Sequence, residues 1–397
     1  MKKICYICDS LCMGGAEKVL IDMLTNLDHN VYSITLCLLK NENAFEHITN
    51  NLPIEIYSLN MNETIPKGWR EFVKLYQLYR KIKSLNPDII QTQGQDSDLY
   101  GQFVGIMLRI KVISMIHIED VFRHDGTSAT YRYMIKLWLE NHTIHTCYKI
   151  IAISESIKYF AVNIRNMPEQ RVIIIRNSVP LLKRSLPKEQ AKSIYFGENG
   201  NIVIGSICRL APQKNILLGI LSFSYVYMKN NNARYIIVGD GPERNILHFY
   251  SQKLGIENAV IFTGWQKDVK PFLELFDILL ITSYTEGLPL VLLEAMSICV
   301  PIVSSNINGI QELITNGYSG ILVNTAGEEK LAKVISKGEP HDISSSHEFA
   351  KAIEKLISNP KYAHLLAQNA RKTFEEECSL EGNVQKLQEL YATATHL

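Results

Sequence analysis

The stretch Ile278-Leu-Leu-Ile-Thr-Ser-Tyr-Thr-Glu-Gly-Leu-Pro-Leu-Val-Leu-Leu-Glu294 joins two apolar runs through a short polar loop. Its first part, Ile278–Thr282, is typical of a strand buried in a parallel sheet. Pro289 suits the first turn of a helix, where its missing N–H costs nothing. Glu286 therefore falls in a strand-to-helix loop, and Glu294 falls inside the helix. The stretch predicts one strand–loop–helix unit of a parallel α/β sheet.

The same alternation continues on both sides of this stretch and predicts two sheets. We therefore expect an α/β protein with two Rossmann-like domains that face each other across a cleft. The expected domains are 1–177 and 201–378, joined by a linker at 178–200, and a C-terminal helix at 379–397 returns to the first domain. The strands are expected at Ile4–Cys8, Tyr32–Leu39, Ile54–Leu59, Asp88–Gln91, Val112–Ile118, Ile150–Ile153 and Val172–Ile175, and then at Ile202–Ile207, Tyr235–Val238, Val260–Thr263, Ile278–Thr282, Ile302–Ser304 and Ile321–Val323.

The composition indicates a globular protein with well-developed cores. The 397 residues are 46% hydrophobic and 20% charged, and the net charge is +1, which argues against nucleic-acid binding as the main role. No apolar run approaches the ~20 residues of a membrane span. The N-terminus is typical of a first strand and not of a signal peptide, and most of the eight cysteines lie in apolar runs. These features predict a cytoplasmic location.

The two glutamates of the opening stretch allow two interpretations. Free amides at the start of a helix attract phosphate, and a carboxylate beside them can bind sugar hydroxyls. Glu294 could reach the hydroxyls of a ribose. The simpler interpretation is that acidic residues near a helix start stabilise the helix dipole. The pair alone favours that simpler interpretation, so the decision depends on residues elsewhere in the chain.

Two further strand-to-helix loops carry phosphate-binding residue types. Arg209 and Lys214, in Ile207-Cys-Arg-Leu-Ala-Pro-Gln-Lys-Asn215, could clamp a diphosphate, although a solvated basic loop explains them equally well. Gly14 and Gly15 follow the first strand and could admit a ligand to the backbone. They do not form the Gly-x-Gly-x-x-Gly dinucleotide fingerprint, which weakens an NAD-binding interpretation.

Taken together, these motifs resemble glycosyltransferase family 4, the retaining group 1 glycosyl transferases with the GT-B fold. The resemblance covers nearly the whole chain, and the order and spacing of its parts are specific. It departs from the family at Asn177-Ser-Val-Pro180, where many members have Asn-Gly-Val-Asp. The segments that match the family are Gly14–Glu17, Ile153–Ser156, Ile175–Val179, Arg209–Lys214, Ile237–Glu243, Phe262–Trp265, Glu286–Glu294, Pro301–Val303 and Gly309–Ile314.

The resemblance implies a role for each matching position. Arg209 and Lys214 would hold the donor diphosphate. Glu286 would bind a hydroxyl of the transferred sugar and Glu294 the nucleotide ribose. The remaining donor contacts would come from Gly287, Leu288, Trp265 near the nucleobase, Gly14 and Gly15 near the phosphates, and His117 near the reaction centre. Without the family context, a lone histidine such as His117 at a strand end is more often structural.

The implied reaction moves a sugar from a nucleotide diphosphate sugar, by family frequency a UDP-sugar, to an acceptor hydroxyl with retention of configuration. No cofactor or metal is expected, and we interpret Asp96-Ser97-Asp98 as a polar strand-end loop. The acceptor would be a glycan or a lipid-linked glycan of surface polysaccharide synthesis. The alternatives are a nucleotide-sugar epimerase of the same two-domain shape, an NAD-dependent oxidoreductase, and a non-catalytic nucleotide-sugar-binding protein.

Two segments fall outside these motifs. Residues 65–85 carry six basic residues and one acidic residue, with aromatic residues at helical spacing. We expect this helix to pack its aromatic face on the sheet, and the alternative is a helix that lies on an anionic membrane surface. Residues 327–350 are charged and contain Pro340 and a serine run, and we expect a surface excursion, to which the sequence assigns no role.

Overall fold

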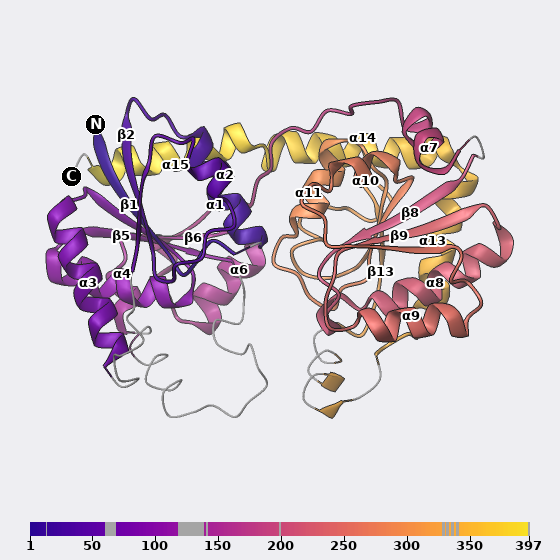
Figure 1. The fold of residues 1–397 in the computed structure, drawn as a ribbon, viewed down its shortest axis with the longest axis horizontal. Coiled ribbons are helices and arrows are strands. Elements are labelled where there is room, and N and C mark those ends of the chain that lie inside the picture. The colour runs from indigo at the N-terminus through magenta and orange to yellow at the C-terminus, as the bar shows by residue number, and fades with distance from the viewer. Residues whose placement is uncertain are drawn as a thin grey trace. The chain divides into compact units, whose positions relative to one another are not determined.

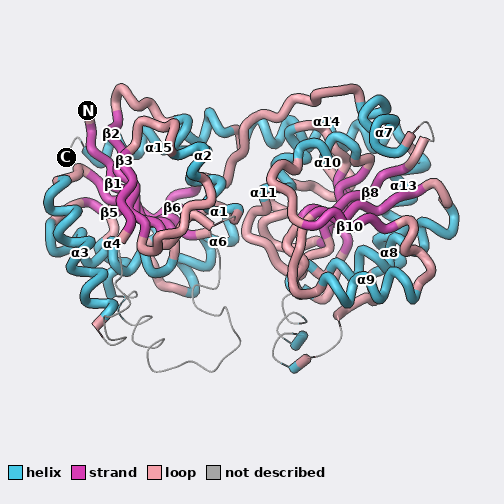
Figure 2. The backbone as a smooth tube through the Cα atoms, viewed as in Figure 1, coloured by secondary structure: helices cyan, strands magenta, loops and turns pink. Residues whose placement is uncertain are grey.

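The computed structural model describes most of the chain in two compact units. The described residues are 1–12, 14–59, 69–117, 139, 142–197, 200–327, 330, 333–334, 337–338 and 341–395. One unit comprises Met1–Ser178 with Leu380–Leu397, and the other comprises Val179–Ser379. Each unit is built around its own parallel sheet (Figures 1 and 2).

The sheet of the first unit has seven parallel strands in the order β3-β2-β1-β4-β5-β6-β7. Every residue of β4 is buried, as expected for a central strand of a sheet covered on both faces. The strand bounds are β1 Lys2–Cys8, β2 Tyr32–Leu38, β3 Glu55–Ser58, β4 Ile89–Gln93, β5 Lys111–Ile116, β6 Lys149–Ala152 and β7 Val172–Ile174.

The helices of the first unit include the last helix of the chain, α15 (Leu380–Thr395), which packs on β4 and α1. The buried hydroxyl of Tyr391 contacts the hydroxyl of Tyr6 on β1 and the side chain of Gln91 on β4. Lys111 also donates to the Ala394 carbonyl at 2.7 Å. The other helical elements are α1 Gly15–Asn26, α2 Glu46–Thr49, α3 Arg70–Leu85, α4 Gln95–Leu108, η1 Ile144–Thr146, α6 Glu155–Tyr159, the π-helix η2 Phe160–Ile164 and η3 Glu169–Arg171.

The sheet of the second unit has six parallel strands in the order β10-β9-β8-β11-β12-β13. Their bounds are β8 Ile202–Ile207, β9 Ala233–Val238, β10 Val260–Gly264, β11 Ile278–Ile281, β12 Ile302–Ser305 and β13 Ile321–Val323. Helix α8 packs on α9 and α13, whereas α11 packs on α10 and α14 (Figure 1). Their bounds, with those of α7 and η4, are α7 Lys188–Phe196, η4 Pro212–Lys214, α8 Ile216–Lys229, α9 Arg244–Lys253, α10 Lys270–Leu275, α11 Leu290–Ser297, α13 Ser346–Ser358 and α14 Pro360–Glu377.

The stretch 178–200, which we expected to be a linker, contains α7 and groups with the second unit from Val179 onward. Two lysines of α7 hold it there. Lys188 and Lys192 donate to the two carboxylate oxygens of Asp277, at 2.7 and 2.6 Å. These ion pairs hold a polar, lysine-containing segment on the second unit, where α7 packs on α10.

Strand order places one switch point in each sheet. In the first sheet the order reverses between β1 and β4, and in the second between β8 and β11. The loops that leave the carboxyl ends of such neighbouring strands diverge to opposite faces of the sheet, and ligands bind between them. The relevant loops are therefore those that follow β1 and β4, and β8 and β11.

Candidate functional site

The loop after β11 holds Glu286 in a fixed position. The Glu286 carboxylate accepts hydrogen bonds from the Ser283 hydroxyl at 2.6 Å and from the Lys214 ammonium at 2.6 and 2.8 Å. The Lys214 and Glu286 side chains are 21% and 10% exposed. The structure thus brings together two predicted site residues that lie 72 positions apart in the chain.

The loop after β8 is joined to the loop after β11 by further hydrogen bonds. The Thr282 hydroxyl donates to the carbonyls of Lys214 and Asn215 at 3.1 and 2.9 Å. The Tyr284 amide donates to the Gln213 carbonyl at 2.9 Å. Burial lowers the pKa of Lys214, but the adjacent Glu286 carboxylate more than offsets this effect and leaves the pKa above its usual value. Lys214 is therefore a fixed cation at the switch point.

Arg209 lies in the same loop and faces solvent. Among the described residues, its guanidinium has no hydrogen-bond or ion-pair partner, so its five N–H donors are available to a ligand. The backbone beside it is fixed by the loop after β9. The Leu210 amide donates to the Asp240 carbonyl at 2.9 Å, and the Glu243 amide donates to the Leu210 carbonyl at 3.0 Å.

Gly309 is a site-forming residue to which the sequence analysis gave no role. Its φ of +78° lies in the left-handed region, and a Cβ built on it would lie 1.9 Å from the Gly287 carbonyl oxygen and 2.8 Å from that of Glu286. The backbone after β12 therefore touches the backbone of the Glu286 loop directly. The sequence signal was the Gly309–Ile314 segment, which we used only as part of the family pattern.

The other predicted donor residues of the second unit lie near this loop or further along the sheet. Gly287 and Leu288 continue it toward α11, and Leu288 is buried. Glu294 lies within α11 and is also buried. Trp265 follows β10, at the edge of the sheet, and its side chain is exposed.

Gly14 and Gly15 lie at the start of α1 in the first unit, after β1. Both are exposed. Gly14 has an extended backbone, with φ of −137°, so its conformation does not require glycine. A Cβ there would lie 2.2 Å from Glu17 Oε2, the end of a flexible side chain that can move. The glycine pair therefore keeps the α1 start open but imposes no special turn.

His117 follows β5, next to the strands of the first switch point. It is partly buried, and its ring nitrogens have no hydrogen-bond partner among the described residues. Burial lowers the pKa of His117 to about 4. The imidazole is therefore neutral at neutral pH, and its one donor and one acceptor nitrogen are both buried.

The Asp96-Ser97-Asp98 segment is not the strand-end loop that we expected. It forms the first turn of α4, and Asp9 caps this helix by accepting the amides of Ser97 at 2.7 Å and Asp96 at 3.4 Å. Asp98 is buried and accepts hydrogen bonds from the hydroxyls of Thr92 and Ser114. The interpretation was wrong because a helix cap from a residue 88 positions away is not visible locally. Within the described part of the chain, no three His, Cys, Asp or Glu side chains are grouped as a metal site requires.

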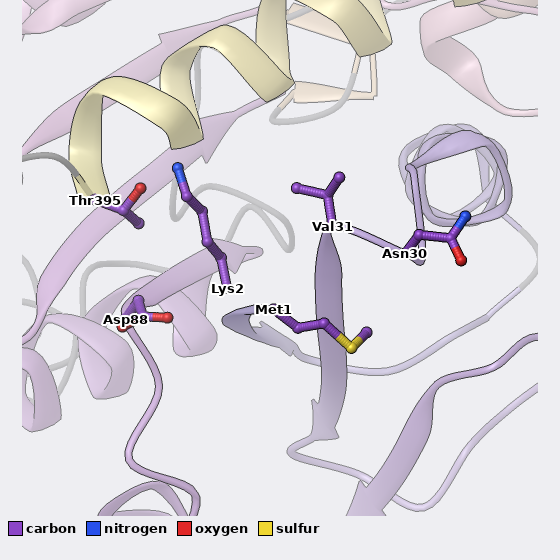
Figure 3. A pocket seen from close by; sticks show the side chains of 6 residues that line it. All are labelled: Met1, Lys2, Asn30, Val31, Asp88 and Thr395. Carbon is purple, nitrogen blue, oxygen red and sulfur yellow. The ribbon is translucent and has the colours of Figure 1, made fainter.

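One pocket of the first unit lies at the amino ends of its strands, away from the carboxyl ends that carry the candidate residues (Figure 3). Its lining residues are at or next to the amino ends of β1, β2 and β4, together with the end of α15. They are Met1, Lys2, Asn30, Val31, Asp88 and Thr395. The carboxyl ends of the strands carry the residues described above, so this pocket takes no part in the candidate site.

Comparison with known proteins identifies the class of enzyme. The model of the family described as Glycosyltransferase Family 4 matches residues 13–181, and that described as Glycosyl transferases group 1 matches residues 188–339. The chain is 23% identical to the UDP-Gal:alpha-D-GlcNAc-diphosphoundecaprenol alpha-1,3-galactosyltransferase of Escherichia coli, over 96% of this chain and 94% of that protein. It is 23% identical to the capsular polysaccharide biosynthesis glycosyltransferase CapM of Staphylococcus aureus, over 82% of this chain and 80% of CapM.

Solved structures show the same fold. The structure of Anabaena HepE in complex with UDP and glucose aligns with a TM-score of 0.80 at 20% identity, covering 99% of this chain and all of that one. WaaG, a glycosyltransferase involved in lipopolysaccharide biosynthesis, aligns with a TM-score of 0.71 at 14% identity, covering 98% and 99%. The two parallel α/β domains thus have the GT-B fold.

This chain belongs to the group 1 glycosyl transferases, and it is a glycosyltransferase. Among the functions that the sequence left open, this membership selects glycosyl transfer over nucleotide-sugar epimerisation, hydride transfer and simple binding.

Proposed function

We propose that this enzyme transfers a hexosyl or N-acetylhexosaminyl group, with retention of configuration, from a UDP-sugar to a hydroxyl of a glycan or lipid-linked acceptor. One observation carries the proposal. The Lys214 ammonium and the Glu286 carboxylate are held 2.6 Å apart by loops on the two sides of a switch point, with the exposed guanidinium of Arg209 in one of these loops. The two cations, Arg209 and Lys214, can bind the oxygens of a diphosphate, and the Glu286 carboxylate can accept hydrogen bonds from sugar hydroxyls.

The donor roles follow from this arrangement. Arg209 and Lys214 bind the diphosphate, and the free amides at the start of α11, with Gly287 and Leu288, add donors. Glu286 accepts a hydrogen bond from a hydroxyl of the transferred sugar. Further along the chain, Glu294 binds the ribose and Trp265 lies near the nucleobase. In the first unit, Gly14 and Gly15 admit the phosphates, and the neutral His117 contacts the donor sugar.

The chemistry requires stabilisation of the leaving group above all. The bond between the anomeric carbon and the diphosphate oxygen breaks, and a bond to the acceptor oxygen forms on the same face of the sugar. The acceptor proton passes to the leaving phosphate, so no side chain is assigned as general base. Arg209 and Lys214 neutralise the growing charge of the diphosphate, which is the step that preorganised charges accelerate most. Neither a metal nor a cofactor has a role in this proposal.

Relatives support the choice of substrates. The Escherichia coli relative is named for UDP-Gal as donor and an alpha-D-GlcNAc-diphosphoundecaprenol as acceptor. HepE has been crystallised with UDP, with UDP and glucose, and with UDP-glucose. We therefore propose a UDP-sugar donor and an acceptor carried on a lipid diphosphate, in the synthesis of a surface polysaccharide or glycoconjugate.

A donor screen tests this function. The full chain is incubated with UDP-, GDP- and ADP-linked hexoses and N-acetylhexosamines, with and without short glycan and lipid-linked acceptors, and released nucleotide is measured. We expect UDP release that depends on acceptor, and NMR of the product should show the anomeric configuration of the donor. Release of GDP or ADP alone would contradict the donor assignment, and an inverted product would contradict retention.

We further propose that α3 contacts the anionic inner face of the cytoplasmic membrane, where a lipid-linked acceptor is found. Contrary to our expectation, the aromatic residues of this segment do not all pack on the sheet. Trp69, Phe72 and Tyr76 are 66%, 68% and 59% exposed, and the buried residues of α3 are Leu78 and Ile82. Residues 65–68 of the predicted segment lie outside the described residues.

The exposed aromatic residues and two exposed cations form one stripe along α3, and Glu71 and Ser84 are exposed as well. The spacing of Trp69, Phe72, Tyr76, Arg80 and Lys83 is three or four residues throughout, which places them on one helix face. Aromatic side chains occupy its first half and cations its second. This is the composition of a helix that lies in the interface of an anionic bilayer. None of the described helices could cross a membrane.

Vesicle sedimentation tests the membrane contact. We expect the full chain to bind phosphatidylglycerol vesicles, and we expect Trp69→Ser/Phe72→Ser/Tyr76→Ser to reduce the partition coefficient by roughly tenfold or more, because the aromatic anchors are lost. Phe249→Ser is the matched control, since Phe249 is 53% exposed on α9 of the other unit. Equal binding of the wild type and the triple variant would mean that this face of α3 does not contact the membrane.

A further inference from the structure

The segment 341–345, part of the surface excursion to which the sequence assigned no role, contacts the loops of the candidate site. His341 Nε2 lies 2.6 Å from Glu243 Oε1. Since a carboxylate only accepts, Nε2 carries the proton. The amide of Asp342 donates to the Tyr284 hydroxyl at 2.8 Å, and the Asn215 side chain donates to the Asp342 carbonyl at 3.1 Å. Two adjacent residues thus bind three loops of the second unit.

Each of these loops carries or adjoins a residue of the proposed donor site. Asn215 directly follows Lys214 in the loop after β8. Tyr284 lies two residues before Glu286 in the loop after β11. The loop after β9 supplies Glu243, whose amide donates to the carbonyl of Leu210, next to Arg209. His341 and Asp342 therefore connect the loops whose backbones position the proposed donor-binding side chains, which are Arg209, Lys214 and Glu286.

The contacts are shielded from water, so they hold the loops firmly. Tyr284 and Asn215 are buried, and the His341 and Glu243 side chains are only 13% and 11% exposed. The His341 ring stacks on the Tyr284 ring at an interplanar angle of 13°. Glu243 Oε2 is buried and has no hydrogen-bond partner among the described residues. Without His341, the buried Glu243 carboxylate would lose the strong charge-assisted hydrogen bond to Oε1.

We infer that His341 and Asp342 are positioning residues of the donor site, which fix the loops after β8, β9 and β11 in the arrangement that binds the nucleotide diphosphate. The inference rests on the proposed function and adds to it a segment of the chain that contains no family motif. It predicts that the affinity for nucleotide depends on His341, to which we assign no direct contact with the donor.

Nucleotide binding by the full chain tests this inference. Kd values for UDP and GDP are measured by calorimetry for the wild type, His341→Ala, His341→Gln and His347→Ala. We expect His341→Ala to raise the nucleotide Kd by about tenfold or more, because a buried hydrogen bond to a charged group is lost. His341→Gln keeps an N–H donor near Nε2 and should restore most of the affinity. In transfer assays the donor KM should rise more than kcat falls.

His347 is the matched control, because its ring also packs on a tyrosine of the same unit, Tyr225, at a centroid distance of 4.0 Å. His347→Ala should bind nucleotide as the wild type does. Three outcomes would overturn the inference: His341→Ala binds like the wild type, His347→Ala loses as much affinity as His341→Ala, or His341→Gln gives no rescue. A wild-type chain that binds neither UDP nor GDP would overturn the proposed function as well, whereas an active wild type with an unaffected His341→Ala would overturn the positioning role alone.

Discussion

Replacement of Lys214 by methionine is expected to lower the rate of sugar transfer about 100- to 1000-fold, the usual effect of removing one preorganised group that stabilises a developing anion. The variant removes the cation proposed to face the leaving diphosphate. Among the described residues, the Glu286 carboxylate, which is 10% exposed, then keeps only the hydrogen bond from the Ser283 hydroxyl at 2.6 Å. The measurement is the initial rate of nucleotide release with the donor that the screen identifies.

Lys229→Met is the control for this prediction. Lys229 also forms an ion pair with a glutamate of the same unit, Glu354, at 2.8 Å, but its side chain is 68% exposed. An exposed pair of this kind contributes little to stability, so this variant should keep near-wild-type transfer. If Lys214→Met retained transfer within about tenfold of the wild type while folding normally, the assignment of Lys214 to the diphosphate would be wrong.

The sequence predicted the sheets better than the surfaces that cover them. Periodic apolar runs and Pro289 located β11 and α11 because strands and helices leave local patterns. The same patterns could not show which face of α3 is covered. The aromatic residues were expected to pack on the sheet, yet Leu78 and Ile82 occupy the buried face and Phe72 is exposed. Side-chain size alone does not identify the neighbour that a helix face meets.

The site residues show a similar limit. Lys214 and Glu286 were each singled out from local sequence, but neither their ion pair nor the role of Gly309 follows from spacing. These contacts join residues that are far apart in the chain. The bond between His341 and Glu243 spans 98 positions, and its segment carries no motif, so the sequence analysis gave it no function. Strand order, which places β8 beside β11, is the information that was missing.

Replacement of Gly309 by alanine is expected to lower sugar transfer by roughly 100-fold or more, because the new Cβ must displace the Glu286 loop. Gly309 touches backbone, not a flexible side chain: the Gly287 carbonyl oxygen would lie 1.9 Å from the added carbon. The loop must therefore move by more than an ångström to restore normal contact. A shift of this size at the proposed sugar-binding carboxylate would disturb the alignment of donor and acceptor.

The chain offers a control that separates this displacement from backbone strain. Gly317 has almost the same left-handed φ, +76° against +78°, but a Cβ there would meet only the Tyr362 hydroxyl, at 3.7 Å. Both alanine variants therefore carry a similar conformational cost, about 1–2 kcal/mol. Gly309→Ala also carries the cost of the displaced loop, so it should melt at a lower temperature than Gly317→Ala. Only Gly309→Ala pushes on the Glu286 loop, so only it should lose transfer. Equal losses of transfer in the two variants would mean that backbone strain, and not the position of Glu286, limits activity. This result would contradict the proposed role of the Glu286 loop in binding the donor sugar.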